Sequence, residues 1–352
     1  MSPVLTIRAG TEARRIIERD GFDPDMFGLL LGASGGPKWL VLSHIDRVLA
    51  SRLIAPRTKR LRMMGSSIGA WRHSCLARRD PLAAIELFEE LYIGQSYDGR
   101  PGAERVSADT VELTRKLLGA DGIEELLSAD KLDSYIVTVR SRGPMATENH
   151  VGLQLGLAVA ALANAVSRRT LPAFFERVVF GPEPSGISFA SLRTCHRRLT
   201  PANFERVLLA SGSIPLAMRG VDGIEGAERG LYRDGGLTDY NFDFEFDHGD
   251  GLLLFPHFFD RISPGWFDKG LRWRRPVRER LSRTLMICPS AEFIAGLPGG
   301  RVPDRSDFVR YSTAERWRIW REVTGRCRKL AEELEELIER GRLGAVLEDF
   351  LA

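Results

Sequence analysis

Two serines of the 352-residue chain lie in the pattern glycine, any residue, serine, any residue, glycine. One is Ser67, between Gly65 and Gly69, and the other is Ser34, within residues 32–36. Small residues at these positions permit the sharp strand-to-helix turn that exposes a nucleophilic hydroxyl. The chemistry expected of such a serine is attack on a carbonyl carbon, with formation of an acyl-enzyme.

The order of the two turns favours Ser67 as the nucleophile. A serine in such a turn needs N–H donors for the oxyanion from a second backbone segment, which follows an earlier neighbouring strand. Ser34 has little chain before it, whereas Ser67 is preceded by the turn at Gly35 and Gly36. We therefore expect the backbone N–H groups of Gly35, Gly36 and Lys38 to form the oxyanion hole. A phosphate-binding or closely packed turn is the alternative for these glycines.

A base is expected at Asp234, which follows the predicted strand 230–233 and precedes Gly235 and Gly236. Two glycines let the chain fold away and leave the carboxylate accessible at the carboxyl end of the strand. An isolated Asp-Gly-Gly is usually a simple turn, so this assignment depends on Ser67. Asp234 would accept the Ser67 proton. Because a free aspartate, with a pKa near ~3.9, is a weak base, we expect the oxyanion hole to supply most of the stabilisation.

Glycine-rich turns that connect apolar runs to helices predict an α/β fold with a central, mostly parallel sheet between helices. Right-handed crossovers place the turns at 32–36 and 65–69 side by side, at the carboxyl ends of adjacent strands. Strands are expected at 26–31, 60–64, 134–139, 177–180, 230–233, 251–255 and 284–287, and helices at 11–19, 37–49, 70–78, 156–166 and 201–209.

Residues 1–352 are expected to form one domain, with a core over 24–290, a helical insertion over 81–131 and a helical tail over 305–352. The insertion forms either a lid over an acyl pocket or a simple cover for the sheet. In the tail, a capping-box pattern at 312–315 precedes a long helix. We expect its apolar stripe to pack on the domain, with dimerisation as the alternative. The stripe consists of Trp317, Trp320, Cys327, Leu330, Leu334 and Leu337.

Composition and charge exclude several classes of protein. The chain is 43% apolar and 28% charged, with a net charge of +3, which is typical of a globular protein and gives no reason to expect nucleic-acid binding. Its four cysteines are far apart, so neither a zinc cluster nor a disulfide framework is expected, and a reducing cytoplasm fits best. No secretion signal is visible, and the longest apolar stretch, residues 156–163, is too short to cross a bilayer. Neither a metal nor a cofactor is expected.

One of the six histidines is a candidate for a catalytic triad. His257 follows the predicted strand 251–255, so a Ser-His-Asp hydrolase is the alternative to a serine–aspartate pair. The acidic residues between Asp239 and Asp250 do not have the spacing of a calcium-binding loop, and we expect a solvated acidic loop there.

A segment with alternating aromatic and basic residues suits contact with an anionic lipid surface. Trp266, Phe267 and Trp273 alternate with Lys269 and with a series of arginines that ends at Arg283. Rings of this kind enter the headgroup region of a membrane, while arginines meet phosphates. A packed loop with a solvated basic rim is the alternative.

Four of these elements follow the order found in the patatin-like phospholipases. They are the turn at 35–38 (Gly-Gly-Pro-Lys), the turn around Ser67, the segment 210–215 (Ala-Ser-Gly-Ser-Ile-Pro) and Asp234 with its two glycines. The chain resembles this family from about residue 27 to residue 241.

The resemblance implies a Ser67–Asp234 dyad on a sheet sandwiched by helices, acting as a phospholipase A-type lipid acyl hydrolase. Ser34 and Trp39 stand where the family usually has glycine, and the bulk of Trp39 would narrow the acyl site. The substrate would be a lipid or another acyl ester. Hydrolysis of a thioester or of an intracellular polyester, and a lipid-binding module with an inactive site, are the alternatives.

Overall fold

The computed structural model describes residues 3–97, 99, 101–182, 192–242, 251–271 and 273–350. Their strands form one ten-stranded sheet in the order β10-β1-β9-β8-β2-β3-β4-β5-β6, and β7 also pairs with β4. The strands are β1 (Leu5–Ala9), β2 (Phe27–Gly32), β3 (Leu61–Ser66), β4 (Leu132–Ser141), β5 (Phe175–Gly181), β6 (Thr194–Arg198), β7 (Tyr232–Asp234), β8 (Leu252–Pro256), β9 (Thr284–Pro289) and β10 (Glu348–Asp349).

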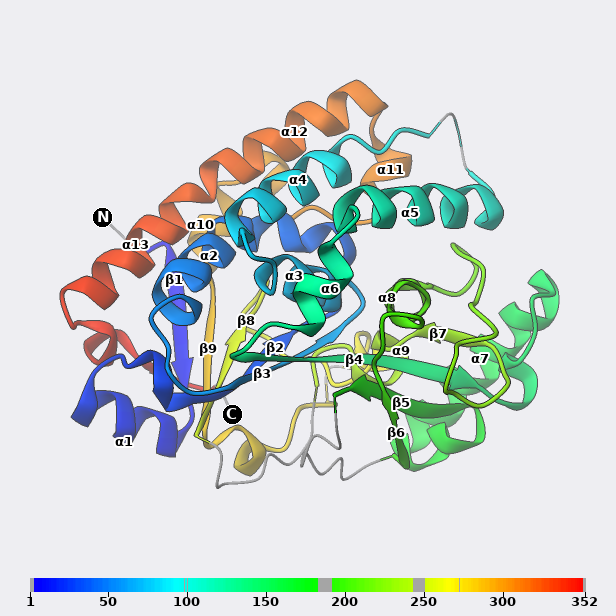
Figure 1. The fold of residues 1–352 in the computed structure, drawn as a ribbon, viewed down its shortest axis with the longest axis horizontal. Coiled ribbons are helices and arrows are strands. Elements are labelled where there is room, and N and C mark those ends of the chain that lie inside the picture. Colours follow the sequence, from blue (N-terminus) through cyan, green and yellow to red (C-terminus); the bar gives the residue numbers. More distant parts are fainter. Residues whose placement is uncertain are drawn as a thin grey trace.

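Helices cover the sheet. In Figure 1, α4, α12 and α13 run along one side of the sheet, while α7 lies beside β4 and β5, at the opposite end from α1. The α-helices are α1 (Thr11–Asp20), α2 (Ser43–Val48), α3 (Ile68–Leu76), α4 (Pro81–Ile93), α5 (Ala103–Leu118), α6 (Gly122–Leu127), α7 (His150–Val166), α8 (Phe204–Gly212), α9 (Gly236–Asp239), α10 (Ala291–Ala295), α11 (Asp307–Arg310), α12 (Thr313–Arg326) and α13 (Arg328–Glu339).

The centre of the sheet is parallel, which confirms the predicted fold class. β2 pairs in parallel with β3 and β8, β3 with β4, and β8 with β9. Antiparallel pairing occurs toward the ends, where β1 meets β9 and where β4 meets β5 and β7. The central strands are buried on both faces and consist of short apolar runs, as parallel strands do.

Three strands were not expected from the sequence. β1 contains Arg8, so its sequence is not an apolar run. The Arg8 side chain is buried and pairs with Asp260. β10 has only two residues, which pair with β1. β6 is polar and half-buried at the other edge of the sheet. In each case the pairing with a distant strand, rather than the local pattern, sets the conformation.

Two expected helices are divided. The segment predicted as one helix over 37–49 is a 3-10 helix, η2 (Gly36–Leu42), followed by α2 and by a π-helical turn, η3 (Leu49–Ile54). The tail helix is interrupted at Cys327 between α12 and α13. Its apolar stripe packs on the domain: Trp320, Cys327, Leu330 and Leu334 are at most 1% exposed. No helix in the described part of the chain is long and apolar enough to cross a membrane.

Candidate active site

The two glycine turns lie side by side at the carboxyl ends of β2 and β3. Gly32 and Gly65 are register partners in the parallel pair. A methyl group at Gly69 would lie 1.9 Å from the Gly32 carbonyl oxygen, and one at Gly65 would lie 2.5 Å from the backbone of Ala70. No side chain fits at these distances. Gly69 is therefore required by the close approach of the two turns, and Gly65 by its contact with the start of α3.

Ser67 occupies the strained position of this turn. Its backbone has φ 54° and ψ −132°, a combination that residues other than glycine rarely adopt. The serine joins β3 to α3 directly, which is the strand–turn–helix setting of a nucleophile elbow. Arg72 fixes α3 against α2, because its guanidinium binds both Asp46 oxygens at 2.8 and 2.5 Å in the buried interior.

The structure brings Asp234 to the Ser67 hydroxyl, although 167 residues separate them in the chain. Ser67 Oγ donates to Asp234 Oδ2 at 2.8 Å, and the other carboxylate oxygen accepts the Gly236 N–H at 2.7 Å. Burial raises the pKa of Asp234 to about 6, although the hydrogen bonds from Ser67 and Gly236 act in the opposite direction. This carboxylate is a stronger base than a free aspartate and is still ionised near neutral pH.

The last turn of α8 and the residue that follows the helix hold both members of the pair. Ser211 Oγ accepts the Ser67 N–H at 2.9 Å and donates to the Val137 carbonyl of β4 at 2.7 Å. The Ser213 carbonyl accepts the Asp234 N–H at 3.0 Å. Residues 210–215, singled out from the sequence only by resemblance, therefore have a physical role in positioning the two side chains.

The turn after Asp234 is tightly packed. A methyl group at Gly235 would lie 2.3 Å from the Val137 carbonyl oxygen, and one at Gly236 would lie 2.5 Å from Ser34 Oγ. Asp239, at the end of α9, binds Arg177 of β5 at 2.7 and 2.6 Å. The first residue of the expected solvated acidic loop is thus buried in an ion pair, and residues 243–250 lie outside the described residues.

Gly35 and Gly36 line the same cavity as Ser67 and Asp234. Gly36 has φ 55°, which favours glycine. Among the hydrogen bonds of the described residues, none is donated by the N–H of either glycine, so both donors are available to an oxyanion. The third expected donor, the Lys38 N–H, donates instead to the Gly35 carbonyl in the first turn of η2, with 3.4 Å between nitrogen and oxygen.

Ser34 is held in a different environment. Its hydroxyl donates to Ser66, with Oγ 3.0 Å from the Ser66 hydroxyl oxygen and 3.2 Å from the carbonyl. The residue is buried, and its backbone does not have the positive φ of Ser67. Ser34 lines the same cavity as Ser67, but no carboxylate among the described residues hydrogen-bonds to its hydroxyl, which is the arrangement expected if Ser67 is the nucleophile.

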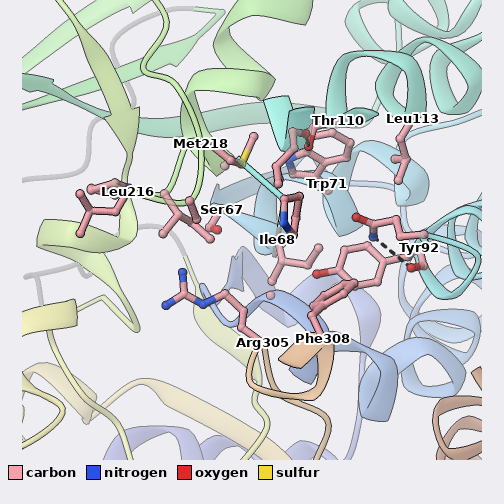
Figure 2. Close-up of a pocket in the computed structure, with 18 of the residues that line it drawn as sticks. Ser67, Ile68, Trp71, Tyr92, Thr110, Leu113, Leu216, Met218, Arg305 and Phe308 are labelled. Carbon is pink, nitrogen blue, oxygen red and sulfur yellow. Dashed lines mark hydrogen bonds between the residues drawn. The ribbon is translucent and has the colours of Figure 1, made fainter. Parts of the chain in front are cut away.

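An apolar cavity of about 570 Å³ opens on one side of Ser67. Its walls come from the helical insertion, from the segment after α8 and from the tail, and Figure 2 shows Trp71, Tyr92, Leu113 and Phe308 around it. The volume lies within the range of small-molecule sites. Segment 81–131, predicted to be a lid or a cover, forms a wall of this cavity through residues of α4 and α5.

A smaller cavity of about 160 Å³ adjoins the apolar cavity at Ser67, and charged side chains contribute to its lining. Lys38 hydrogen-bonds to Asp304, and the Lys269 ammonium lies 3.6 Å from the centre of the Tyr240 ring. Burial lowers the pKa of Lys269 to about 7, and Lys38 and Arg305 add to the effect. Arg305 lines both cavities, and Figure 2 shows it below Ser67.

Trp39 does not narrow the acyl site, contrary to the prediction. It is buried behind the apolar cavity, stacked on Phe88 with ring centres 4.5 Å apart. Phe88 in turn faces Trp71, 5.9 Å away. The bulk of Trp39 therefore supports the cavity wall from outside.

His257 does not take part in the arrangement around Ser67. Its ring hydrogen-bonds to the Phe259 carbonyl at 2.6 Å, and burial lowers its pKa to about 4. Neither cavity beside Ser67 has a histidine among its described lining residues. The Ser67 hydroxyl donates to Asp234 instead, which is the geometry of a dyad.

The aromatic and basic segment is divided between the interior and the surface. Trp266 lines both cavities, and Phe267 packs against Phe175 with ring centres 5.9 Å apart. Trp273 is exposed, and Arg283 donates to the Gly251 carbonyl. Arg272 lies outside the described residues.

Three residues of the site were missed in the sequence. Arg305 and Phe308 come from the tail and Asp304 directly precedes it, and all three reach the cavities through long-range packing. Their local sequence contains no motif that indicates a site. The chain matches no known family model, and no curated protein is similar to it in sequence.

Proposed function

We propose that the protein is a serine hydrolase that cleaves carboxylic esters of lipids through a Ser67–Asp234 dyad. The observation that carries this proposal is the 2.8 Å hydrogen bond from a strained, elbow-positioned serine to a buried aspartate. The resemblance to patatin-like phospholipases, drawn from the order of four motifs, agrees with this pairing.

In the proposed mechanism, Ser67 Oγ attacks the ester carbonyl carbon while Asp234 accepts its proton. The negative charge that develops on the carbonyl oxygen is stabilised by the N–H groups of Gly35 and Gly36. Collapse of the tetrahedral intermediate breaks the bond to the alcohol, which takes the proton from Asp234. Water then attacks the acyl-Ser67 ester while Asp234 accepts its proton, and collapse of this second intermediate releases the fatty acid as Ser67 Oγ takes the proton back from Asp234.

The two cavities support a lipid substrate. An acyl chain fits the apolar cavity, whereas the leaving alcohol faces the smaller cavity with Lys38, Lys269 and Arg305. These cationic side chains favour a leaving alcohol that carries an anionic group such as a phosphate, because charge-assisted hydrogen bonds are strong. This asymmetry favours a phospholipid over a neutral ester or a polyester.

The test compares two serines that share one sequence pattern. Ser67→Ala is expected to abolish both labelling by a fluorophosphonate and turnover of a nitrophenyl ester, because it removes the nucleophile. Ser34→Ala, the matched control, is expected to retain labelling, because the Ser34 hydroxyl donates to Ser66 and not to Asp234. Mass spectrometry of the labelled peptide identifies the modified serine. Labelling that survives in Ser67→Ala and disappears in Ser34→Ala would reverse the assignment.

A further inference from the structure

Helix α7 exposes a row of large aliphatic side chains to solvent. Five residues that are between 52% and 86% exposed lie on it. At about 100° per residue they fall within an arc of about 80°, so they form one continuous stripe. We call them the α7 stripe: Val151, Leu155, Val159, Leu162 and Val166.

The opposite face of α7 is also apolar. Leu153, Leu157 and Ala160 are buried against β4 and β5 residues such as Val139 and Phe175. Leu157 also lines the apolar cavity beside Ser67. The helix therefore contributes to the wall of the cavity and presents apolar side chains both to the domain and to solvent.

No aspartate, glutamate, lysine or arginine occurs between His150 and Val166. A helix that faces water normally has a polar outer face, so a contiguous apolar stripe of this length marks an interaction surface. The described surface has few other large apolar side chains with comparable exposure, and they are scattered over several elements.

The carboxyl end of α7 is basic and aromatic. Arg169 is exposed three residues beyond the end of the helix. Arg274 donates to the Asn164 and Ala165 carbonyls, which holds its exposed neighbour Trp273 near the end of the stripe. Tryptophan and arginine next to an apolar helix face are the combination that binds the interface of an anionic membrane.

We propose that the α7 stripe docks on an anionic lipid surface, with the helix lying in the plane of the interface. This inference rests on the proposed lipid substrate. It places the apolar cavity close to the membrane, because Leu157 on the inner face of the same helix lines that cavity. Burial of the five side chains in the acyl boundary supplies the apolar contribution, and Arg169 supplies attraction to lipid phosphates.

The test measures co-sedimentation with phosphatidylcholine vesicles that contain or lack phosphatidylglycerol. Leu155→Glu/Leu162→Glu is expected to weaken binding to anionic vesicles at least tenfold. Leu82→Glu/Val346→Glu, which makes the same charge change at exposed apolar residues elsewhere, is expected to bind as the wild type does. Arg169→Glu is expected to weaken binding to the vesicles that contain phosphatidylglycerol and to leave binding to pure phosphatidylcholine vesicles unchanged.

Turnover of a soluble nitrophenyl ester, thermal melting and light scattering accompany each measurement. Unchanged soluble turnover in Leu155→Glu/Leu162→Glu shows that the fold and site persist. Absence of vesicle binding by the wild type, or equal binding by this variant, would overturn the proposal. A wild-type dimer that dissociates in the variant, with vesicle binding unchanged, would assign the stripe to self-association. Failure of the proposed catalysis would appear separately, as a wild type without ester turnover.

Discussion

Burial of the Asp234 carboxylate has opposite consequences for folding and for catalysis. In the unfolded chain an aspartate ionises near its ordinary pKa of 3.8, whereas in the folded protein burial raises the pKa to about 6. At neutral pH the fold therefore holds an ionised group in an environment that disfavours charge. The same environment makes the carboxylate basic enough to accept a proton from Ser67.

We expect Asp234→Asn to lower ester turnover by at least two orders of magnitude and to stabilise the fold. The amide cannot accept the Ser67 proton, but it can hydrogen-bond to Ser67 and Gly236 without a buried charge. One pKa unit corresponds to about 1.36 kcal/mol, so we expect the free energy of unfolding at pH 8 to rise by roughly 1–3 kcal/mol. Urea denaturation and steady-state kinetics measure the two effects.

The stabilisation should depend on pH in a defined direction. Between about pH 4 and pH 6 the folded wild type binds more protons at Asp234 than the unfolded chain, so its stability falls as the pH rises. The advantage of Asp234→Asn should therefore grow through this window and become constant above it. A variant with wild-type turnover, or with a pH-independent stability difference, would remove Asp234 from the role of buried base.

At the residue scale, the sequence predicted what depends on local geometry. The glycines around Ser67 and after Asp234 could be recognised because close backbone approach excludes side chains at those positions. The role of Ser211 as acceptor of the Ser67 N–H could not be recognised from the sequence, since it depends on how α8 packs against β4. The prediction that Trp39 narrows the acyl site was wrong, because the direction of a side chain within η2 is set by tertiary packing.

At the element scale, the smaller cavity is built from two loops that were not expected to meet. The 3-10 helix η7 (Trp266–Asp268) precedes Lys269, and the turn before α11 contributes Asp304 and Arg305. The charged groups around the Lys269 ammonium are Lys38, Arg305, Asp304 and Asp234. Part of Lys269 is exposed, but its ammonium lies over the Tyr240 ring within this cavity.

We expect the charge on the leaving group to change the pH profile of turnover. For an ester of a sulfonated phenol, kcat/KM should rise through about pH 6 as Asp234 ionises and fall above about pH 7 as Lys269 loses its proton. The corresponding uncharged phenol ester should show only the rise. Lys269→Met should abolish the fall and lower kcat/KM for the sulfonated ester roughly tenfold, as expected for loss of a charge-assisted hydrogen bond.

The comparison of the two esters provides the control, because they share the acyl chain and the step at Ser67. Lys329→Met, a lysine of α13 remote from both cavities, should leave both profiles unchanged. Identical profiles for the two esters in the wild type would mean that the cationic cavity does not receive the leaving group.

Elements were predictable where hydrophobic periodicity sets them. β2, β3, β8 and β9 are short apolar runs, and each was expected within one or two residues of its observed ends. β1 and β10 were missed, since their pairing joins the two ends of the chain. The division of 37–49 into η2 and α2 also escaped prediction, because no proline or glycine occurs at the junction.

At the scale of the whole molecule, the C-terminal tail packs beside the site, and its residues line both cavities. The Asp307 carboxylate accepts the Trp320 indole N–H at 2.9 Å and the Asp304 N–H at 3.1 Å, and it also binds Arg301. These contacts hold the turn that carries Arg305 between α12 and the glycine turn. The Arg305 stem lies 3.6 Å from the position of a methyl group at Gly36.

We expect Phe308 to link this tail to selectivity for acyl chain length. The Phe308 ring lines the apolar cavity and packs edge-on against Trp320, with ring centres 5.3 Å apart. Phe308→Ala should lower kcat/KM for a dodecanoyl ester roughly tenfold relative to an acetyl ester, because only the long chain loses contact with the ring.

Val309→Ala is the matched control for this change, since Val309 is the next residue of α11 and is 63% exposed. The ratio of the two kcat/KM values does not depend on the fraction of folded enzyme, so destabilisation by loss of the ring does not mimic the effect. If the ratio is unchanged in Phe308→Ala, the long acyl chain does not occupy the apolar cavity. In that case the tail closes the fold without selecting the substrate.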